Sequence, residues 1–203
     1  MGCCSSREEE VTIELNTTQN AAVVCRGGKV GTNVKMNQND KGDWQVKGKG
    51  TMLGSCCLDC DTAYWEVKVV QGAANVDIGL KKFNKRRPVS LEGTIKTNNE
   101  GKGDEPCWSL QRDFLPKDIT DLKDGDVIGV HWDQTDFPMV CFALNGEFLP
   151  NASITRIRPA QDIHPAVSVT GNGIVEIRFD SENFQYKPIA SKFSAIVCAT
   201  NLI

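Results

Sequence analysis

The stretch Met139–Leu149, which reads MVCFALNGEFL, contains the clearest signal of local structure in the chain. Two apolar runs flank Asn145 and Gly146. Both of these residues tolerate the positive φ angles that a tight type I′ turn requires. The stretch therefore predicts a β-hairpin, and further strands should lie on either side of it.

A second stretch, TAYWEVKVVQG at residues 62–72, alternates two sets of side chains with a period of two. The sets are Tyr64, Glu66 and Lys68 on one face, and Trp65, Val67 and Val69 on the other. This period is typical of a β-strand with one buried face. We expect the face with Trp65 to be buried and the face with Glu66 to be polar.

Short runs of Val, Ile, Trp and Phe recur along the rest of the chain, separated by Gly, Asn and Asp. AAVVCRGGKV predicts a strand that runs into a Gly27-Gly28 turn, and HPAVSVTGNGIVEIRF predicts two strands joined by residues 170–173. VDIGLKKF and GDVIGVHWDQ predict two more. Helical segments do not alternate with these strands, so the sequence favours antiparallel sheets in a sandwich or barrel over a parallel-sheet enzyme fold.

Composition limits the possible classes of protein. The 203 residues suit one domain, and 40% apolar and 24% charged residues are globular values. The net charge of −3 argues against broad electrostatic binding to nucleic acid. The nine cysteines are an odd number without an export signal. We expect them to be mostly free thiols of a cytosolic protein, several of them buried.

Six motifs in chain order resemble the strand motifs of SPRY domains: YWEVKV, DIGL, CWSL, GDVIGVHWD, FALNGEFL and HPAVSV with VEIRF. The match covers roughly residues 23–184, and VVCRGGKVGT with GSCCLDC is most similar to the small SPRY-only proteins. The resemblance implies an all-β, bent antiparallel β-sandwich with short terminal extensions. We expect an N-terminal tail at 1–10, the sandwich at 11–187 and an apolar C-terminal extension at 188–203 that packs against it.

The resemblance also implies a non-catalytic module that binds a protein partner through loops. One loop lies at residues 170–172 and another lies within the long polar segment 84–107. The residues expected to contact the partner are Lys85, Arg86, Arg87, Asn98, Asn99, Thr170, Gly171 and Asn172. We expect a protein that is monomeric by itself, without a cofactor. The alternative function is that of a structural component in a cytoskeletal or ciliary assembly.

The chain opens MGCCSSREEE, which matches the N-myristoylation pattern with Gly2 as acceptor and Ser6 at the Ser/Thr position. One myristoyl chain gives only marginal membrane binding, so a second signal is required. The acidic run that follows disfavours electrostatic attachment to anionic lipid. We therefore expect palmitoylation of Cys3 or Cys4 and a location at the cytosolic leaflet of a membrane. An unmodified terminus is the alternative.

Three other motifs have ordinary explanations. The run CCLDC, with Cys56, Cys57 and Cys60, contains a single C-x-x-C pair where a structural zinc site needs four ligands, so we favour thiols at a strand edge. The basic run KKFNKRR at residues 81–87 is typical of a solvated loop edge, with docking of an acidic partner or lipid as the alternative. His131 alternates with apolar neighbours and suits a partly buried strand position. No catalytic sequence motif points to an enzyme.

Overall fold

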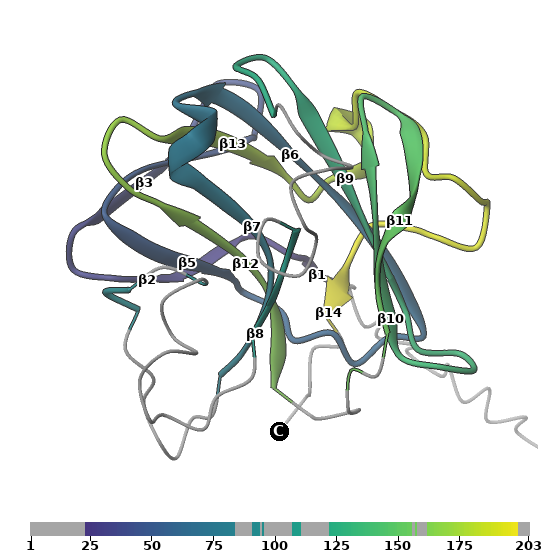
Figure 1. Ribbon diagram of the computed structural model, residues 1–203. Helices are drawn as coiled ribbons and strands as arrows, with labels where there is room; N and C mark the ends of the chain where they lie inside the picture. The colour runs from purple at the N-terminus through teal and green to yellow at the C-terminus, as the bar shows by residue number, and fades with distance from the viewer. Residues whose placement is uncertain are drawn as a thin grey trace, which may run out of the picture.

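The computed structural model describes residues 23–83, 91–93, 95, 107–110, 122–155, 157 and 162–198. These residues form fourteen β-strands and two short 3-10 helices, η1 (Ala73–Asn75) and η3 (Ser181–Asn183). Every strand pair among them is antiparallel. The prediction of an all-β antiparallel sandwich is confirmed (Figure 1).

The larger sheet has seven strands in the order β11-β10-β9-β6-β13-β4-β3. Their bounds are β3 (Val34–Gln38), β4 (Trp44–Gly48), β6 (Thr62–Gln71), β9 (Val127–Asp133), β10 (Met139–Leu144), β11 (Glu147–Ile154) and β13 (Ile174–Arg178). The long strand β6 lies near its centre, between β9 and β13.

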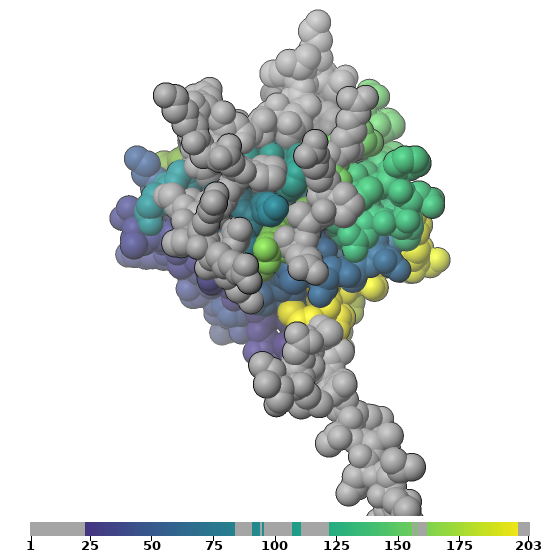
Figure 2. All heavy atoms as spheres, turned by 90° about the horizontal axis from the view of Figure 1, so that it is seen from below, coloured from purple at the N-terminus to yellow at the C-terminus, as the bar shows by residue number. Residues whose placement is uncertain are grey.

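The smaller sheet has five strands in the order β2-β5-β12-β7-β8. Their bounds are β2 (Gly27–Val30), β5 (Gly50–Gly54), β7 (Val76–Lys82), β8 (Cys107–Ser109) and β12 (Ile163–Val169). A separate two-stranded ladder pairs β1 (Val23–Val24) with β14 (Val197–Cys198). This ladder brings together two parts of the chain that are far apart in sequence, and Figure 2 shows the purple and yellow segments meeting on one face.

The main core lies between the two larger sheets. Trp65, Val67 and Val69 of β6 belong to the same buried cluster as Ile78 and Leu80 of β7. A second, smaller cluster combines Leu53 of β5 and Ala166 of β12 with side chains from the long segment after β7. Those side chains are Phe83, Leu91, Ile95 and Cys107.

The predicted turns are mostly confirmed. Asn145 and Gly146 have φ angles of 50° and 84° and join β10 to β11. Gly27 and Gly28 are different, because they begin strand β2 instead of forming a turn. A Cβ at Gly27 would lie 2.4 Å from the Met36 sulfur and 2.7 Å from the Trp44 ring. The glycine there permits close packing between strands.

The outer face of the seven-stranded sheet departs from the sequence prediction. Tyr64 and Glu66 were expected on a polar face, yet they are 1% and 0% exposed. Residues 184–196, which we call the C-terminal strap, cover this face. Phe184 packs edge-on against Tyr64, and Phe193 packs edge-on against His131. Strand β6 is therefore buried on both faces from Ala63 to Val67.

The C-terminal extension thus packs on the sandwich over the residues described. Phe193 and Ile196 are 7% and 0% exposed, and Ala195 forms a parallel bridge with Tyr64. In the described part of the chain, no helix has the length and apolar character to cross a membrane.

Candidate interaction surface and the network behind it

The β12–β13 turn at residues 170–173 is the predicted partner-binding loop that the structure describes. The Gly173 amide donates to the Thr170 carbonyl at 2.8 Å, which closes the turn. Gly171 adopts a φ of 53°, a conformation that glycine accepts easily. Gly171 and Asn172 are exposed, whereas Thr170 is partly buried. The turn therefore presents a glycine and a carboxamide side chain to solvent.

This turn is fixed against η1. The Thr170 amide donates to the Asn75 carbonyl at 2.9 Å, and the Asn75 side-chain amide donates to Asn172 Oδ1 at 2.7 Å. A Cβ at Gly72 would lie 2.6 Å from Asn172 Oδ1, so only glycine permits this approach. A backbone hydrogen bond and a side-chain hydrogen bond therefore hold the η1 connection and the 170–173 turn together.

Two further connections lie at the same end. The Ala73 amide donates to Asp124 Oδ1 at 3.0 Å, which joins η1 to the turn before β9. Asn145 joins that turn to the β10–β11 hairpin, because its Nδ2 donates to Asp126 Oδ1 at 2.8 Å. We call these four connections the loop end: residues 72–75, 123–126, 145–146 and 170–173.

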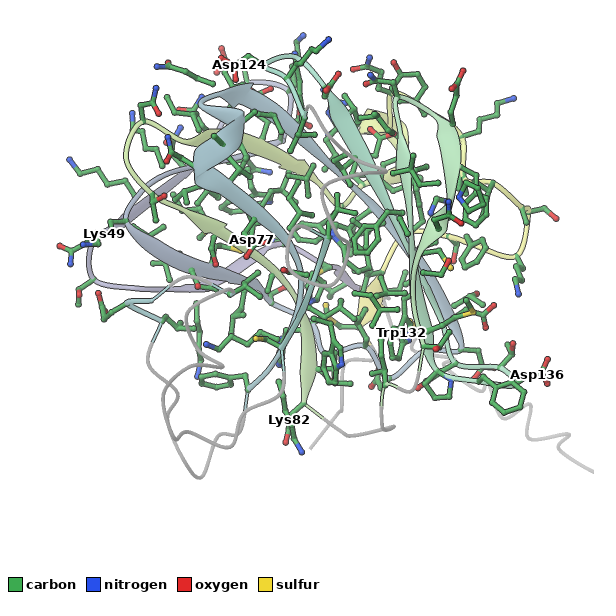
Figure 3. The ribbon with its side chains drawn as sticks, viewed as in Figure 1. Lys49, Asp77, Lys82, Asp124, Trp132 and Asp136 are labelled. Carbon is green, nitrogen blue, oxygen red and sulfur yellow. A yellow bond between two sulfur atoms is a disulfide. The ribbon has the colours of Figure 1, made fainter. Side chains whose placement is uncertain are left out.

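The loop end carries exposed carboxylate, carboxamide and amine groups on a rigid base. Asp124, Asn145 and Asn172 are exposed, together with Lys123. Figure 3 shows Asp124 at one end of the sandwich and Lys82 at the other. Such groups can hydrogen-bond the backbone and polar side chains of a protein segment. Loops held on a rigid scaffold are a common place for recognition.

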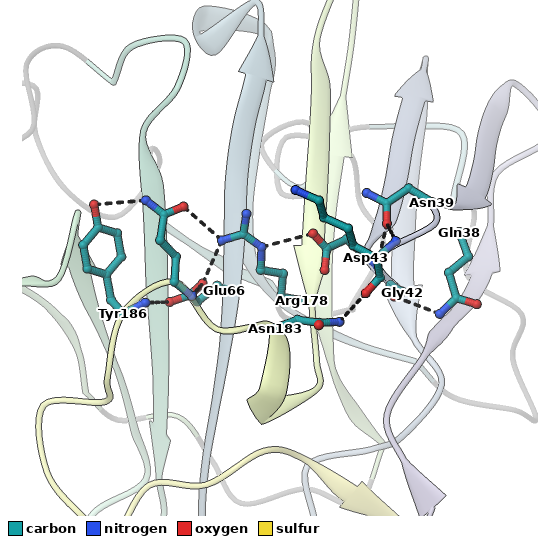
Figure 4. A network of polar contacts seen from close by, with 10 residues as sticks. Gln38, Asn39, Gly42, Asp43, Glu66, Arg178, Asn183 and Tyr186 are labelled. Carbon is teal, nitrogen blue, oxygen red and sulfur yellow. Dashed lines mark hydrogen bonds and ion pairs between the residues drawn. The ribbon is translucent and has the colours of Figure 1, made fainter.

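A different polar arrangement lies under the C-terminal strap, around Glu66 (Figure 4). Both oxygens of this buried carboxylate are used. Oε1 accepts from the Tyr64 hydroxyl at 3.0 Å and the Tyr186 amide at 2.7 Å. Oε2 accepts from Arg178 Nη1 at 3.1 Å and the Gln185 amide at 2.7 Å.

Arg178 extends this network to the β3–β4 hairpin. Its Nε donates to Asp43 Oδ2 at 3.2 Å, so the guanidinium lies between two carboxylates. Burial lowers the pKa of Arg178, but the hydrogen bonds to Glu66 and Asp43 outweigh this effect and raise it. Burial and the neighbouring Glu66 raise the pKa of Tyr64 as well. Both groups keep their protons and act as permanent donors to Glu66.

His131 holds the strap at a second point. The Ile189 amide donates to His131 Nε2 at 3.2 Å, and the imidazole is 1% exposed. Burial lowers the pKa of His131 to about 4. The neutral ring that accepts this hydrogen bond is therefore the normal form near neutral pH. This role is structural, and it agrees with the buried strand position expected from sequence.

A groove of about 620 Å³ lies between β1 and the β3–β4 hairpin. Val23, Val24, Trp44 and Phe179 supply apolar lining, and charged side chains including Arg26 also line it. The groove is distinct from the loop end.

The comparisons with known proteins agree with this architecture. No family model matches the sequence, and no curated protein matches it. Among solved structures, the TRIM65 PSpry domain is similar with a TM-score of 0.51 and 12% identity. The match covers 77% of this chain and 89% of that domain.

The fold is of the SPRY type. The human HERC1 SPRY domain also matches, with a TM-score of 0.48 and 14% identity over 72% of this chain and 94% of that one. The Drosophila melanogaster neuralized NHR1 domain matches with a TM-score of 0.47 and 9% identity, covering 76% of this chain and 97% of that one. The closer resemblance to small SPRY-only proteins stays a prediction.

The SPRY sandwich separates the two predicted loops where they meet the sheet. Thr170 follows Val169, which pairs with the start of β7 at Val76. The long segment 84–107 instead leaves from the end of β7, beyond Lys82. Leu91, within this segment, lies next to β5, because the Thr51 amide donates to the Leu91 carbonyl at 2.8 Å.

Several predicted site residues lie outside the described residues, so their predictions stay open. These are Gly2, Cys3, Cys4, Lys85, Arg86, Arg87, Asn98 and Asn99. The start of the basic run is described, and here the prediction of a solvated edge is wrong for one residue. Lys81 belongs to β7 and is 0% exposed.

The cysteines give a second correction. Cys56 was expected to be a free thiol at a strand edge, but it forms a disulfide with Cys198. Their separation of 142 residues gives no local sequence signal for the pairing. Cys60 has a free thiol. Among the described residues, no group of three or more metal-ligating side chains was found.

Proposed function

We propose that this chain is a non-catalytic protein-interaction module that binds its partner through the loop end. The observation that carries this proposal is the hydrogen bonding among the four connections. The Asn75–Asn172 bond of 2.7 Å and the Ala73–Asp124 bond of 3.0 Å hold exposed polar groups in fixed positions. A pre-organised surface loses less conformational entropy when it binds.

The chemistry of the loop end favours a partner segment with exposed amide and basic groups. Asp124 offers an exposed carboxylate, and Asn172 offers an exposed carboxamide. Carboxylates accept hydrogen bonds from Lys and Arg, and carboxamides both donate to and accept from a peptide backbone. The partner is therefore a protein with an exposed polar segment.

We further propose that the module is tethered to the cytosolic face of a membrane. The supporting observation is the sequence MGCCSS, which offers Gly2 for myristate and Cys3 or Cys4 for palmitate. Two acyl chains give the stable anchoring that one chain does not. Confinement at a surface raises the effective concentration of the module, so a weak contact at the loop end becomes sufficient.

Site-directed photo-crosslinking tests the binding surface. A photoreactive amino acid replaces Lys123 at the loop end or, as the matched control, the exposed Lys187 on the strap. We expect a discrete crosslinked protein from position 123 only, lost when Asn172→Trp is added while the protein still unfolds in one cooperative thermal transition. Equal crosslinking from both positions would contradict the proposal.

Metabolic labelling tests the tether independently. Cells expressing the full chain receive alkyne-tagged myristate or palmitate and are then fractionated. We expect both labels on the parent protein, no myristate on Gly2→Ala, no palmitate on Cys3→Ala/Cys4→Ala, and release of both variants from membranes. An unlabelled, cytosolic parent would remove the tether and leave the interaction surface intact.

A further inference from the structure

The Cys56–Cys198 disulfide closes the chain at the end of the C-terminal strap. Cys56 lies in the connection between β5 and β6 and is 3% exposed. Cys198 belongs to β14 and is partly exposed. The bond therefore joins the last described strand to the edge of the sandwich.

The non-covalent attachment of β14 is small by comparison. Its ladder with β1 consists of two residue pairs, Val23 with Cys198 and Val24 with Val197. One further hydrogen bond runs from the Cys25 amide to the Ile196 carbonyl at 2.8 Å. Isolated two-stranded ladders are marginally stable in water even when they are longer. The disulfide thus determines how firmly β1 and β14 stay paired.

The rest of the strap has its own anchors. Glu66 accepts the amides of Gln185 and Tyr186, and His131 accepts that of Ile189. The Tyr64 amide donates to the Ser194 carbonyl at 2.7 Å. Loss of the disulfide would therefore open only the β1–β14 ladder. That ladder carries Val23 and Val24, which line the 620 Å³ groove.

We propose that Cys56 and Cys198 form a reversible redox site that latches β14 onto β1 and fixes one wall of this groove. The reductant is a dithiol. Disulfides in a reducing compartment are usually transient or redox-sensing, and this use of the bond rests on the cytosolic location proposed above. The opened ladder presents a rearranged groove and frees both chain segments that meet there.

The exchange follows from the accessibility of the two sulfurs. A thiolate of the dithiol attacks Cys198 Sγ, the more exposed of the pair, and the disulfide bond breaks. The electron pair goes to Cys56 Sγ, which takes a proton. The second thiolate of the reductant then attacks the mixed disulfide and releases the Cys198 thiol. Two electrons pass to the protein, and the reductant becomes a disulfide.

The first test measures the bond and its reversibility in the purified full chain produced without acyl groups. Maleimide labelling under denaturing conditions, read by intact mass, should add two fewer groups than the nine cysteines before reduction, and nine afterwards. Incubation at graded ratios of reduced to oxidised dithiothreitol, a small dithiol, should give the same bonded fraction from either direction. Nine labels at the outset, or a bond that persists in a large excess of reduced dithiothreitol, would overturn the proposal.

The second test measures the opening by hydrogen exchange. Reduction should accelerate exchange at Cys25 and in β14 by tenfold or more, while the amides of Gln185, Tyr186 and Ile189 keep their rates. Cys198→Ser should show the fast exchange without reductant and no further response. Cys60→Ser, a neighbouring thiol outside the pair, should behave like the parent protein. Unchanged exchange at Cys25 after reduction would contradict the proposal that the disulfide holds β14 on β1.

These two tests distinguish the proposed redox site from the proposed function. The bond and the exchange rates are measured without membrane or partner, so failed acylation would leave both results standing. A stable bond that never opens would leave the loop-end proposal unaffected.

Discussion

The outer face of the seven-stranded sheet and the loop end use similar polar groups in opposite ways. Under the strap, Glu66 is 0% exposed and binds groups from residues 178, 185 and 186, more than 100 positions away. At the loop end, Asn172 is exposed, with the hydrogen bond from Asn75 as its side-chain contact. Burial, and not residue type, separates a group that stabilises the fold from one available for recognition.

The energetic contrast follows from desolvation. Removing one partner from a buried ionic network leaves another charge buried without compensation, and this costs several kcal/mol. An exposed hydrogen bond competes with water, and its loss costs about 1 kcal/mol or less. Mutations in the two regions should therefore differ in size even when they remove chemically similar groups.

The largest effect is expected at Glu66. Glu66→Ala removes the acceptor for four donors and leaves Arg178 with Asp43 and Gln185. We expect a loss of roughly 3–5 kcal/mol in the free energy of unfolding, measured by urea denaturation. The exposed Glu147→Ala is the control and should stay within about 0.5 kcal/mol of the parent. Similar losses for both variants would remove the contrast between the regions.

Acid should weaken the strap through His131. Its pKa is about 4 in the fold and near 6.5 when unfolded, so the unfolded chain binds more protons between these values. Stability is present above pH 6.5 and falls as the pH decreases toward 4, by roughly 3 kcal/mol. Urea denaturation at a series of pH values measures this slope.

The matched variant for the pH series is His131→Phe. It lacks the titrating group, and its stability should fall less steeply between pH 6.5 and 4 than that of the parent. His164, whose pKa is also lowered by burial, remains in both proteins and cancels in the comparison. An unchanged slope would show that His131 does not govern the acid response.

A smaller change is expected at the loop end. Asn172→Ala removes the bond from Asn75 at an exposed site, so the unfolding free energy should fall by about 1 kcal/mol or less. Hydrogen exchange should nonetheless accelerate at the Asn75 and Thr170 amides. A loss as large as that of Glu66→Ala would mean that the turn belongs to the core structure.

The smallest effect should come from the rim of the strap. Lys192 forms an ion pair with Asp133, but its side chain is 51% exposed. Exposed pairs contribute roughly 0.2–1 kcal/mol, less at high salt. Lys192→Ala should therefore shift the urea midpoint only slightly, and 0.5 M NaCl should remove the difference. A large, salt-independent shift would extend the buried network to this edge.

Much of the sandwich was predictable because its signals are local. The alternation around Trp65 predicted β6, and Asn145-Gly146 predicted the β10–β11 hairpin. The turn after Val169 also lies where the sequence placed it. Period and turn chemistry depend on neighbouring residues, so both can be recognised in one sequence.

The missed features depend on contacts between distant residues. Glu66 fits the pattern of an exposed strand position, and only the strap buries it. Cys56 finds its partner 142 residues away, and Lys81 is 0% exposed although it begins a basic run. Nothing near these residues signals their surroundings. The prediction that residues 85–87 and 98–99 contact a partner stays open.

The pairing of β1 with β14 also affects the order in which the molecule can fold. During synthesis, Val23 emerges early, but its partner Cys198 emerges 175 positions later. Glu66 is likewise synthesised long before its partners, because Arg178 and the strap lie more than 100 positions later in the chain. Contacts of such long sequence range slow folding. A nascent chain interrupted before the strap would leave Glu66 without the amides of Gln185 and Tyr186 and would leave Tyr64 uncovered, so cellular chaperones should bind it in preference to the finished protein.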